Sequence, residues 1–396
     1  MAEFDPFDPA FIADPYPFYH RLRREDPVHR HPLGFYALTR YDDVALLLRD
    51  PRFGKGGYQA LLAARFGGGA EETGAAASML FTDPPDHTRL RTLVSKAFTP
   101  RVVETMRPHV QALVDGFLDR VAAGGGMDVI ADLAYPLPVT VISELLGVPR
   151  EDTERVKQWS LDLARGLDAI AMPVEPDVIA RARAASRAIR RHFQELIARR
   201  RREPQADLLS ALIAVEEAGD RLTEAELLAT CVLLYVAGHE TTVNLIGNGL
   251  LALLRHPAQW ERLVAEPSAV PAAVEELLRY DGPVHRVGRI PDADVELGGR
   301  AIPAGSLVVA LLGAANRDPA HFPEPDRLDV GRHPERHLAF GRGIHSCLGA
   351  PLARLEAQVA LGSLLTRWPR LALASGTLEW RAGATLRGLA ALPVRF

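Results

Sequence analysis

Apolar residues recur with the spacing of amphipathic helices over most of the chain between residues 86 and 279. Short helices are predicted before this region and one more helix is predicted near the end of the chain. The predicted helices cover residues 19–25, 42–49, 86–98, 102–122, 138–146, 152–167, 178–202, 208–218, 274–280 and 348–367. The chain is therefore expected to be mainly helical.

One further helix begins at Thr223 and is expected to be unusually long. Thr223 and Glu226 have the spacing of a capping box, and no proline follows until Pro257. Because residues 227–254 are apolar almost all round, this helix should cross the interior of the protein.

The strand-like segments are short, and they predict a minor β part at about residues 28–40, at 284–315 and at the C-terminus. Residues 316–340 show no regular pattern and predict a long meander. Residues 53–78 are rich in glycine and alanine without a clear period, so we expect a loop there that serves as a mobile lid. With no internal repeat and no linker, residues 1–396 are expected to form a single domain.

Composition changes this picture little but excludes several classes of protein. The 396 residues carry a formal charge of −4, so nothing global predicts binding to nucleic acid or to an anionic membrane. Cys231 and Cys347 lie far apart, which favours free thiols in a reducing compartment. Neither a signal peptide nor a membrane-spanning segment is visible, so a cytoplasmic monomer is expected.

Cys347 lies directly before the last predicted helix, within residues 340–349. A thiol at a helix N-terminus gains from the helix dipole, which lowers its pKa and favours the thiolate that a metal needs. A buried structural thiol is the alternative reading. Zinc fits poorly, because His345 is the only nearby second ligand.

The long helix carries a second unusual segment, residues 237–242. Gly238 costs helix stability and so needs a reason, such as the close approach of a flat partner. Leu234, Ala237, Gly238 and Thr241 share one helix face. A tight helix crossing, with Thr241 bonded back to the carbonyl of Ala237, is the alternative. A zinc-protease motif fails because Val243 occupies the second histidine position.

The segment around Cys347 resembles the haem-binding signature of the cytochrome P450 family, and the resemblance extends over nearly the whole chain. The matching residues are Phe340, Gly341, Gly343, His345, Cys347 and Gly349. The resemblance implies the P450 fold and haem b (iron-protoporphyrin IX), with Cys347 as the iron ligand. It also implies that Phe340, Gly341, Ala237 and Gly238 contact the haem, and that Glu240 and Thr241 deliver protons during catalysis.

The same resemblance implies roles for several charged side chains. His87, Arg91, Arg289 and His345 match the family's contacts to the haem propionates, for which arginine is well suited. Glu276, Arg279 and Arg327 look like the family's buried ion-pair triad, a structural element that holds the meander beneath the cysteine loop. Arg89, Arg342 and Arg354 are expected to offer a basic surface to an acidic electron donor.

The function that the resemblance implies is that of a soluble, bacterial-type haem-thiolate monooxygenase of secondary metabolism. It would insert one oxygen atom of O2 into a small apolar organic substrate by hydroxylation or epoxidation. Because no flavin or nicotinamide motif is visible, electrons from NAD(P)H would arrive through a ferredoxin reductase and a ferredoxin. The expected substrate pocket includes Leu233, Leu234, Ala237, Val284, Thr385 and Leu386.

Two alternatives remain open at this point. A peroxide-driven peroxygenase on the same fold is disfavoured, because such family members replace the acid and alcohol pair that Glu240 and Thr241 form here. A haem-based sensor or carrier of apolar ligands would bind ligands but form no product. Neither reading identifies the substrate, since no charged anchor stands out among the expected pocket residues.

Overall fold

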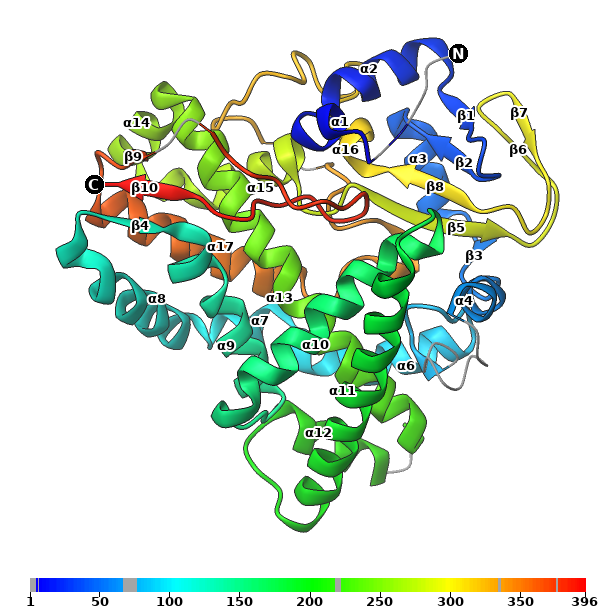
Figure 1. Cartoon of the computed structure of the whole chain (residues 1–396), viewed down its shortest axis with the longest axis horizontal. Helices are drawn as coiled ribbons and strands as arrows, with labels where there is room; N and C mark the ends of the chain where they lie inside the picture. Colours follow the sequence, from blue (N-terminus) through cyan, green and yellow to red (C-terminus); the bar gives the residue numbers. More distant parts are fainter. Residues whose placement is uncertain (1–4, 6, 67–76, 218–221, 334–335, 375–376) are drawn as a thin grey trace.

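Helix α13 (Glu224–Arg255) runs through the interior and organises the other helices around it (Figure 1). Its capping box is formed: Glu226 N donates to Thr223 Oγ1 at 3.3 Å, and Thr223 N donates to Glu226 Oε2 at 2.7 Å. Its residues from Leu227 to Leu253 are mostly buried. The predicted long interior helix is confirmed.

The computed structural model describes residues 5, 7–66, 77–217, 222–333, 336–374 and 377–396. Helices dominate it, with a small sheet region to one side, so the predicted fold class is confirmed (Figure 1). The other helices are α1 (Pro9–Ala13), α2 (Tyr16–Glu25), α3 (Tyr41–Arg49), α4 (Tyr58–Phe66), α6 (Asp86–Ser95), α7 (Pro100–Glu104), α8 (Arg107–Val121), α9 (Pro136–Leu145), α10 (Thr153–Gly166), α11 (Pro176–Arg202), α12 (Leu208–Glu217), α14 (Pro257–Ala265), α15 (Val270–Asp281), α16 (Leu312–Ala315) and α17 (Ala350–Arg367). None of them, within the described residues, has the length and apolarity that a bilayer-crossing helix requires.

The main sheet has five strands in the order β1-β2-β8-β5-β3. Strand β2 pairs in parallel with β8, while β1, β5 and β3 make antiparallel pairs with their neighbours. The strands are β1 (Val28–Arg30), β2 (Tyr36–Leu38), β3 (Phe53–Gly54), β4 (Gly126–Asp128), β5 (Arg286–Pro291), β6 (Val295–Leu297), β7 (Arg300–Ile302), β8 (Val308–Leu311), β9 (Ala372–Leu373) and β10 (Pro393–Arg395). Most strands lie in the predicted ranges, but β3 and β4 fall outside them and were not predicted.

The largest hydrophobic core surrounds α13, which packs against α9, α11, α15 and α17. A smaller core lies between α3 and the main sheet. This arrangement holds the middle of α13 close to the segment that precedes α17, which is the segment that contains Cys347.

Two predicted segments are wrong. Residues 53–78 are not one loop, because β3 and helix α4 (Tyr58–Phe66) form within them; leucine and alanine favour the helix although glycines flank it. Residues 67–76 lie outside the described part, so the predicted lid stays a prediction. The predicted helix 102–122 is interrupted, since Pro108 belongs in the first turn of a new helix, α8 (Arg107–Val121). The extent of the single domain also stays a prediction.

Candidate active site

The loop before α17 folds tightly around Cys347. Its two glycines adopt positive φ angles, +67° at Gly341 and +73° at Gly343, which side chains rarely tolerate. A Cβ at Gly343 would also clash with the backbone carbonyl of Leu48. The Cys347 N–H donates to the carbonyl of Phe340 at 2.9 Å. These constraints present the Cys347 side chain to a cavity of about 290 Å³.

The backbone N–H groups at the N-terminus of α17 lower the pKa of Cys347 as predicted, but a larger opposing effect is present. Burial raises the pKa of this thiol, although the backbone N–H groups of Gly349 and Ala350 and the cations Arg91 and Arg354 act in the opposite direction. A metal ion bound to the sulfur would add a positive charge that favours the thiolate.

Helix α13 lines the same cavity with Leu234, Ala237, Gly238, Thr241 and Thr242. A Cβ at Gly238 would lie 3.1 Å from Ile142 of α9. Helix α9 thus packs closely against α13 at this glycine, as the alternative reading of the segment expects. Gly238 also borders the cavity. Thr241 donates its hydroxyl hydrogen to the carbonyl of Ala237 at 3.1 Å, so its oxygen is left as an acceptor at the cavity wall.

The four residues predicted to contact propionates all line this cavity: His87, Arg91, Arg289 and His345. Burial and the surrounding cations lower the pKa of His345 to about 2, and burial, together with Arg91, lowers that of His87. Both imidazoles are therefore neutral. His87 Nδ1 and His345 Nε2 are buried and have no hydrogen-bond partner among the described residues. Two cations and two unsatisfied ring nitrogens fit the paired carboxylates of a haem.

One residue that sequence reasoning missed, Lys55, joins the same cluster. It follows β3 directly, only 6% of it is exposed, and it lines the cavity beside His87 and Arg289. Burial and the charge of Arg289 lower the pKa of Lys55 well below its usual value. The only signal in the sequence is the scarcity of lysine, which by itself indicates nothing about this position.

Glu240 is buried beside the cavities and is held by a residue that the sequence does not point to. Arg381 Nη1 donates to Glu240 Oε1 at 2.6 Å. The second oxygen, Oε2, is buried without a hydrogen-bond partner among the described residues, and His239 Nε2 lies 4.0 Å from it. The Glu240 carboxyl group is thus anchored at one oxygen and free to accept a hydrogen bond at the other.

A second cavity, of about 260 Å³, adjoins the first, since Lys55, Leu233, Ala237, Thr241 and Val284 line both. Five of the six predicted substrate contacts line it, namely Leu233, Ala237, Val284, Thr385 and Leu386, whereas Leu234 lines only the first cavity. Further apolar residues that the sequence did not single out include Leu80, Phe81 and Ile170. The walls of this second cavity are therefore mostly apolar.

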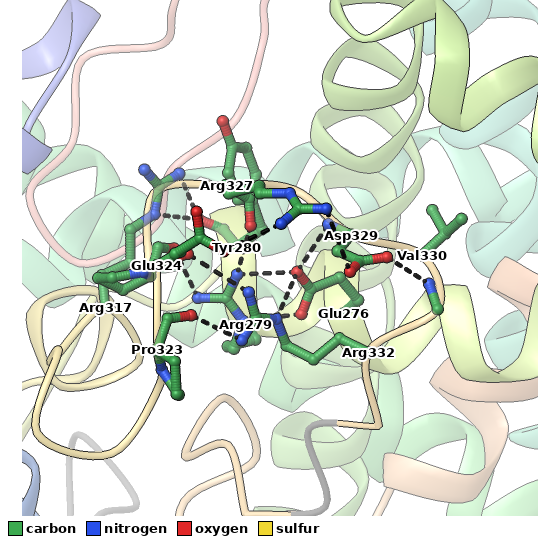
Figure 2. A network of polar contacts seen from close by, with 12 residues as sticks. Glu276, Arg279, Tyr280, Arg317, Pro323, Glu324, Arg327, Asp329, Val330 and Arg332 are labelled. Atoms are coloured by element: carbon green, nitrogen blue, oxygen red, sulfur yellow. Dashed lines mark hydrogen bonds and ion pairs between the residues drawn. The ribbon is translucent and has the colours of Figure 1, made fainter.

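The predicted ion-pair triad needs a correction. Glu276 and Arg279 form a fully buried bidentate pair at 2.7 and 2.8 Å, as expected (Figure 2). Arg327 is wrong: its side chain is 58% exposed and pairs with Glu324, and only its backbone carbonyl accepts from Arg279. The second arginine is Arg332, whose Nε lies 3.3 Å from Glu276 Oε1. The Arg327 side chain is instead exposed to solvent, where it donates to Glu324.

Arg332 also fastens the meander, because its guanidinium donates to the carbonyls of Pro323 and Glu324 at 2.9 and 3.3 Å (Figure 2). The amide of Asp329 donates to Glu276 at 3.1 Å. The buried carboxylate thus receives hydrogen bonds from helix and meander alike. This network holds the meander against α15.

Two of the three arginines expected to meet an electron donor are engaged within the chain. Arg89 pairs with Glu226, and Arg354 donates to Glu275 at 2.6 and 2.8 Å. Burial alone would raise the pKa of Glu275, but the hydrogen bonds from Arg354 and His337 lower it to about 2. The predicted basic surface is therefore reduced, and Arg354 braces α15 against α17.

The fold and this site define a class of protein: a helical enzyme with a cysteine and a cluster of cations around one internal cavity. Comparison with known families makes the class specific, because residues 63–373 match the model of the cytochrome P450 family. Cytochrome P450 107B1 of Saccharopolyspora erythraea is 46% identical over 402 residues, covering 98% of this chain and 96% of the relative. The monooxygenase PikC of Streptomyces venezuelae is 46% identical, covering 98% and 92%.

Among solved structures, myxobacterial CYP267B1 in complex with myristic acid is 44% identical, covers 98% of each chain and superposes with a TM-score of 0.91. The chain belongs to the cytochrome P450 family. It is thus an oxidoreductase of the haem-thiolate monooxygenase type, and the cavity at Cys347 has the donors that such a cofactor requires.

Proposed function

We propose that the chain inserts one oxygen atom of O2 into a small apolar organic substrate, by hydroxylation or epoxidation. One observation carries this proposal: Cys347 and the Ala237–Thr241 segment of α13 line one cavity, which adjoins a second, largely apolar cavity. A haem b held by Cys347 supplies electron transfer and the cleavage of the oxygen–oxygen bond.

The residues around the cofactor have separate tasks in this proposal. Arg91 and Arg289 bind the propionates by charge, while His87 and His345 donate hydrogen bonds to them. Phe340 and Gly341 border the same cavity on the cysteine side. Electrons come from NAD(P)H through a ferredoxin reductase and a ferredoxin, which bind outside the cavity.

Thr241 and Glu240 deliver protons in this proposal. The Thr241 oxygen accepts a hydrogen bond at the cavity wall, because its own hydrogen is donated to Ala237. Arg381 holds one oxygen of Glu240, and the free Oε2 accepts protons from outside and passes them toward Thr241. Both groups belong to one turn of α13, so their spacing is set by the helix.

A Thr241→Ala variant tests the proton pathway, and Thr241→Ser is the matched control because it keeps the hydroxyl. We expect Thr241→Ala to form less product per NAD(P)H by several-fold, with the missing electrons found as hydrogen peroxide. Thr241→Ser should remain near the wild-type ratio. Unchanged coupling in Thr241→Ala would show that the hydroxyl is not used.

The reduced carbon-monoxide spectrum tests the cofactor itself. Wild-type protein should show the absorption band of a thiolate-ligated haem, and Cys347→Ala should lose it. A screen of apolar compounds for a shift of the haem absorption band then identifies ligands. Product formed with peroxide alone, at the rate of the reductase-driven reaction, would instead favour a peroxygenase.

A further inference from the structure

A polar cluster lies beside Glu240, outside the walls of both cavities. Its members are His239, the neighbour of Glu240 on α13, and Tyr135, which directly precedes α9. Within the described part of the chain, the walls of neither cavity include His239 or Tyr135. Tyr135 follows a π-helical turn over Ile130–Ala134, a rare backbone form that is frequent at functional sites.

Three atoms of this cluster are buried and have no hydrogen-bond partner among the described residues: Glu240 Oε2, His239 Nε2 and the Tyr135 hydroxyl. They belong to neighbouring side chains. His239 Nε2 lies 4.0 Å from Glu240 Oε2, and the rings of Tyr135 and His239 meet edge to face with their centroids 6.1 Å apart. Burial and the neighbouring Glu240 raise the pKa of Tyr135, so its hydroxyl keeps the hydrogen and is a donor.

The His239 ring offers an acceptor to this cluster. Its Nδ1 lies 2.9 Å from the backbone carbonyl of Tyr235, which can only accept, so the ring hydrogen is on Nδ1. Burial lowers the pKa of His239, which favours the neutral ring with Nε2 as a bare acceptor. Nε2 and Glu240 Oε2 are thus two acceptors that cannot bond to each other.

One donor and two acceptors match the hydrogen bonds of a single water molecule. Two acceptors that share one water are about 4.4 Å apart when each lies about 2.8 Å from its oxygen, close to the 4.0 Å between His239 Nε2 and Glu240 Oε2. The water would accept its third hydrogen bond from the Tyr135 hydroxyl. Buried waters typically make about three such bonds to otherwise unsatisfied groups.

The cluster lies between Glu240 and the protein surface. Lys157 of α10 places Nζ 4.4 Å from the centroid of the Tyr135 ring and donates to Glu154 at 2.8 Å. The Lys157 side chain is 23% exposed and that of Glu154 is 80% exposed. On the other side, Arg381 is 27% exposed and holds Oε1 of Glu240. Solvent therefore reaches the groups that surround Tyr135.

We propose that Tyr135 and His239 hold a water molecule against Glu240 Oε2. This water re-supplies the proton that Glu240 passes to Thr241. It gives one proton to Oε2 and receives one from the Tyr135 hydroxyl, which takes its own from solvent beside Lys157, so one proton moves inward and no electron is transferred. His239 is a positioning residue, because it accepts the second hydrogen of the water and so directs the first toward Oε2. This inference rests on the proposed function for the roles of Glu240 and Thr241.

Three variants separate the donor from the acceptor of the water site. Tyr135→Phe removes the donor. His239→Asn removes the nitrogen that faces the carboxyl group while its amide replaces the Nδ1 donor, and His239→Gln keeps a polar atom at the far end. Tyr19→Phe is the matched control, because it removes a buried tyrosine hydroxyl that is already bonded within the chain, to His285 at 3.0 Å. Haem content and circular dichroism are recorded for each variant.

Crystal structures of the holoenzyme and its variants, at a resolution that shows ordered waters, test the site without turnover. We expect one water at about 2.7–3.2 Å from each of the Tyr135 hydroxyl, His239 Nε2 and Glu240 Oε2. Tyr135→Phe and His239→Asn should lose or displace it, whereas His239→Gln and Tyr19→Phe should keep it. No water at this position in the wild type overturns the inference, even where a variant does not fold. A water that stays in place in both Tyr135→Phe and His239→Asn also overturns it.

Styrene is the probe for the proton supply, because it is apolar, has no ionisable group and is small enough for a cavity of about 260 Å³. The readouts are hydrogen peroxide formed per NAD(P)H consumed and the ratio of the rates in H2O and D2O. Tyr135→Phe and His239→Asn should form about tenfold less styrene oxide per NAD(P)H, with more peroxide and a larger isotope effect. His239→Gln and Tyr19→Phe should stay near the wild type. Variants that lose the water but keep the wild-type coupling and isotope effect overturn the proton role.

Failure of the proposed function gives a different result. Absence of the thiolate-type carbon-monoxide spectrum, or unchanged coupling in Thr241→Ala, would refute that function. The crystal structures would still show whether Tyr135 and His239 hold a water against Glu240, and they decide the inference if the wild type forms no styrene oxide.

Discussion

Replacing Arg332 by methionine probes the buried ion-pair network that holds the meander against α15. Methionine keeps much of the aliphatic length of arginine, so the change removes the guanidinium with little loss of packing. Arg327→Met is the matched control, since it removes the same group five positions earlier in the same meander. The two variants distinguish the arginine that contacts Glu276 through its side chain from the one that does not.

The expected magnitudes follow from the contacts. Arg332 lies 3.3 Å from a carboxylate that is 0% exposed and donates two hydrogen bonds to meander carbonyls. Loss of such a partner from a buried charge costs about 2 kcal/mol. The carboxylate keeps its bidentate bonds from Arg279, so the loss stays below the roughly 3–5 kcal/mol expected for Arg279→Met. Arg327 pairs with an exposed glutamate, so its replacement should cost about 0.5 kcal/mol or less.

The assay is equilibrium denaturation followed by circular dichroism, with the haem content of the purified protein as a second readout. We expect the order of destabilisation to be Arg279→Met, then Arg332→Met, then Arg327→Met, and haem retention to follow the same order. Glu276→Ala should fail to retain haem, because it leaves Arg279 buried without its carboxylate. A larger loss from Arg327→Met than from Arg332→Met would refute this reasoning.

Two further predictions concern the loop that contains Cys347 and the ion pair between Glu275 and Arg354. Gly343→Ala should cost about 1–3 kcal/mol and lower the haem content, because φ is +73° and a Cβ would meet the Leu48 carbonyl. The control is Gly362→Ala, inside α17 with no atom within 4 Å, which should not be destabilised; equal losses would contradict the argument. Because the pKa of Glu275 is about 2, its ion pair stabilises the fold above about pH 4.5. The stability advantage of wild type over Glu275→Gln, about 1–2 kcal/mol, should therefore shrink as the pH falls toward about 2, and an advantage that grew instead would contradict the assigned pKa.

Much of the fold follows from local signals in the sequence. The capping box at Thr223 and the apolar run after it predict α13, and both hydrogen bonds of the box are present. The errors arise where two local signals compete. Around residues 58–66, glycine-rich flanks concealed a helix, and at Pro108 a continuous apolar pattern concealed the start of a new helix. The spacing of apolar residues indicates which face of a helix is buried, but it does not indicate where one helix ends and the next begins.

The parts of the site that are formed by short local motifs could also be predicted from the sequence. Cys347, the glycines before it and the Ala237–Thr241 segment form short motifs whose chemistry depends on neighbours in the sequence, and the structure places them at one cavity. Arg332 and Arg381 act on carboxylates far away along the chain. No local pattern distinguishes them from other arginines, because their partners are set by the packing of the meander and the C-terminal segment.

Some buried polar and charged side chains of this chain have a partner within the chain, and others have none among the described residues. Glu276, Glu240 and Arg286 each have a partner of opposite charge within the chain, which accounts for their burial as structure. Lys55 has none among the described residues, and neither His87 Nδ1 nor His345 Nε2 has an acceptor there. Because burying a polar group without a partner costs free energy, these groups indicate acids that the chain itself does not supply. Lys55, His87 and His345 border the cavity at Cys347 together with Arg91 and Arg289, so the missing acids fit the two carboxylates of a haem.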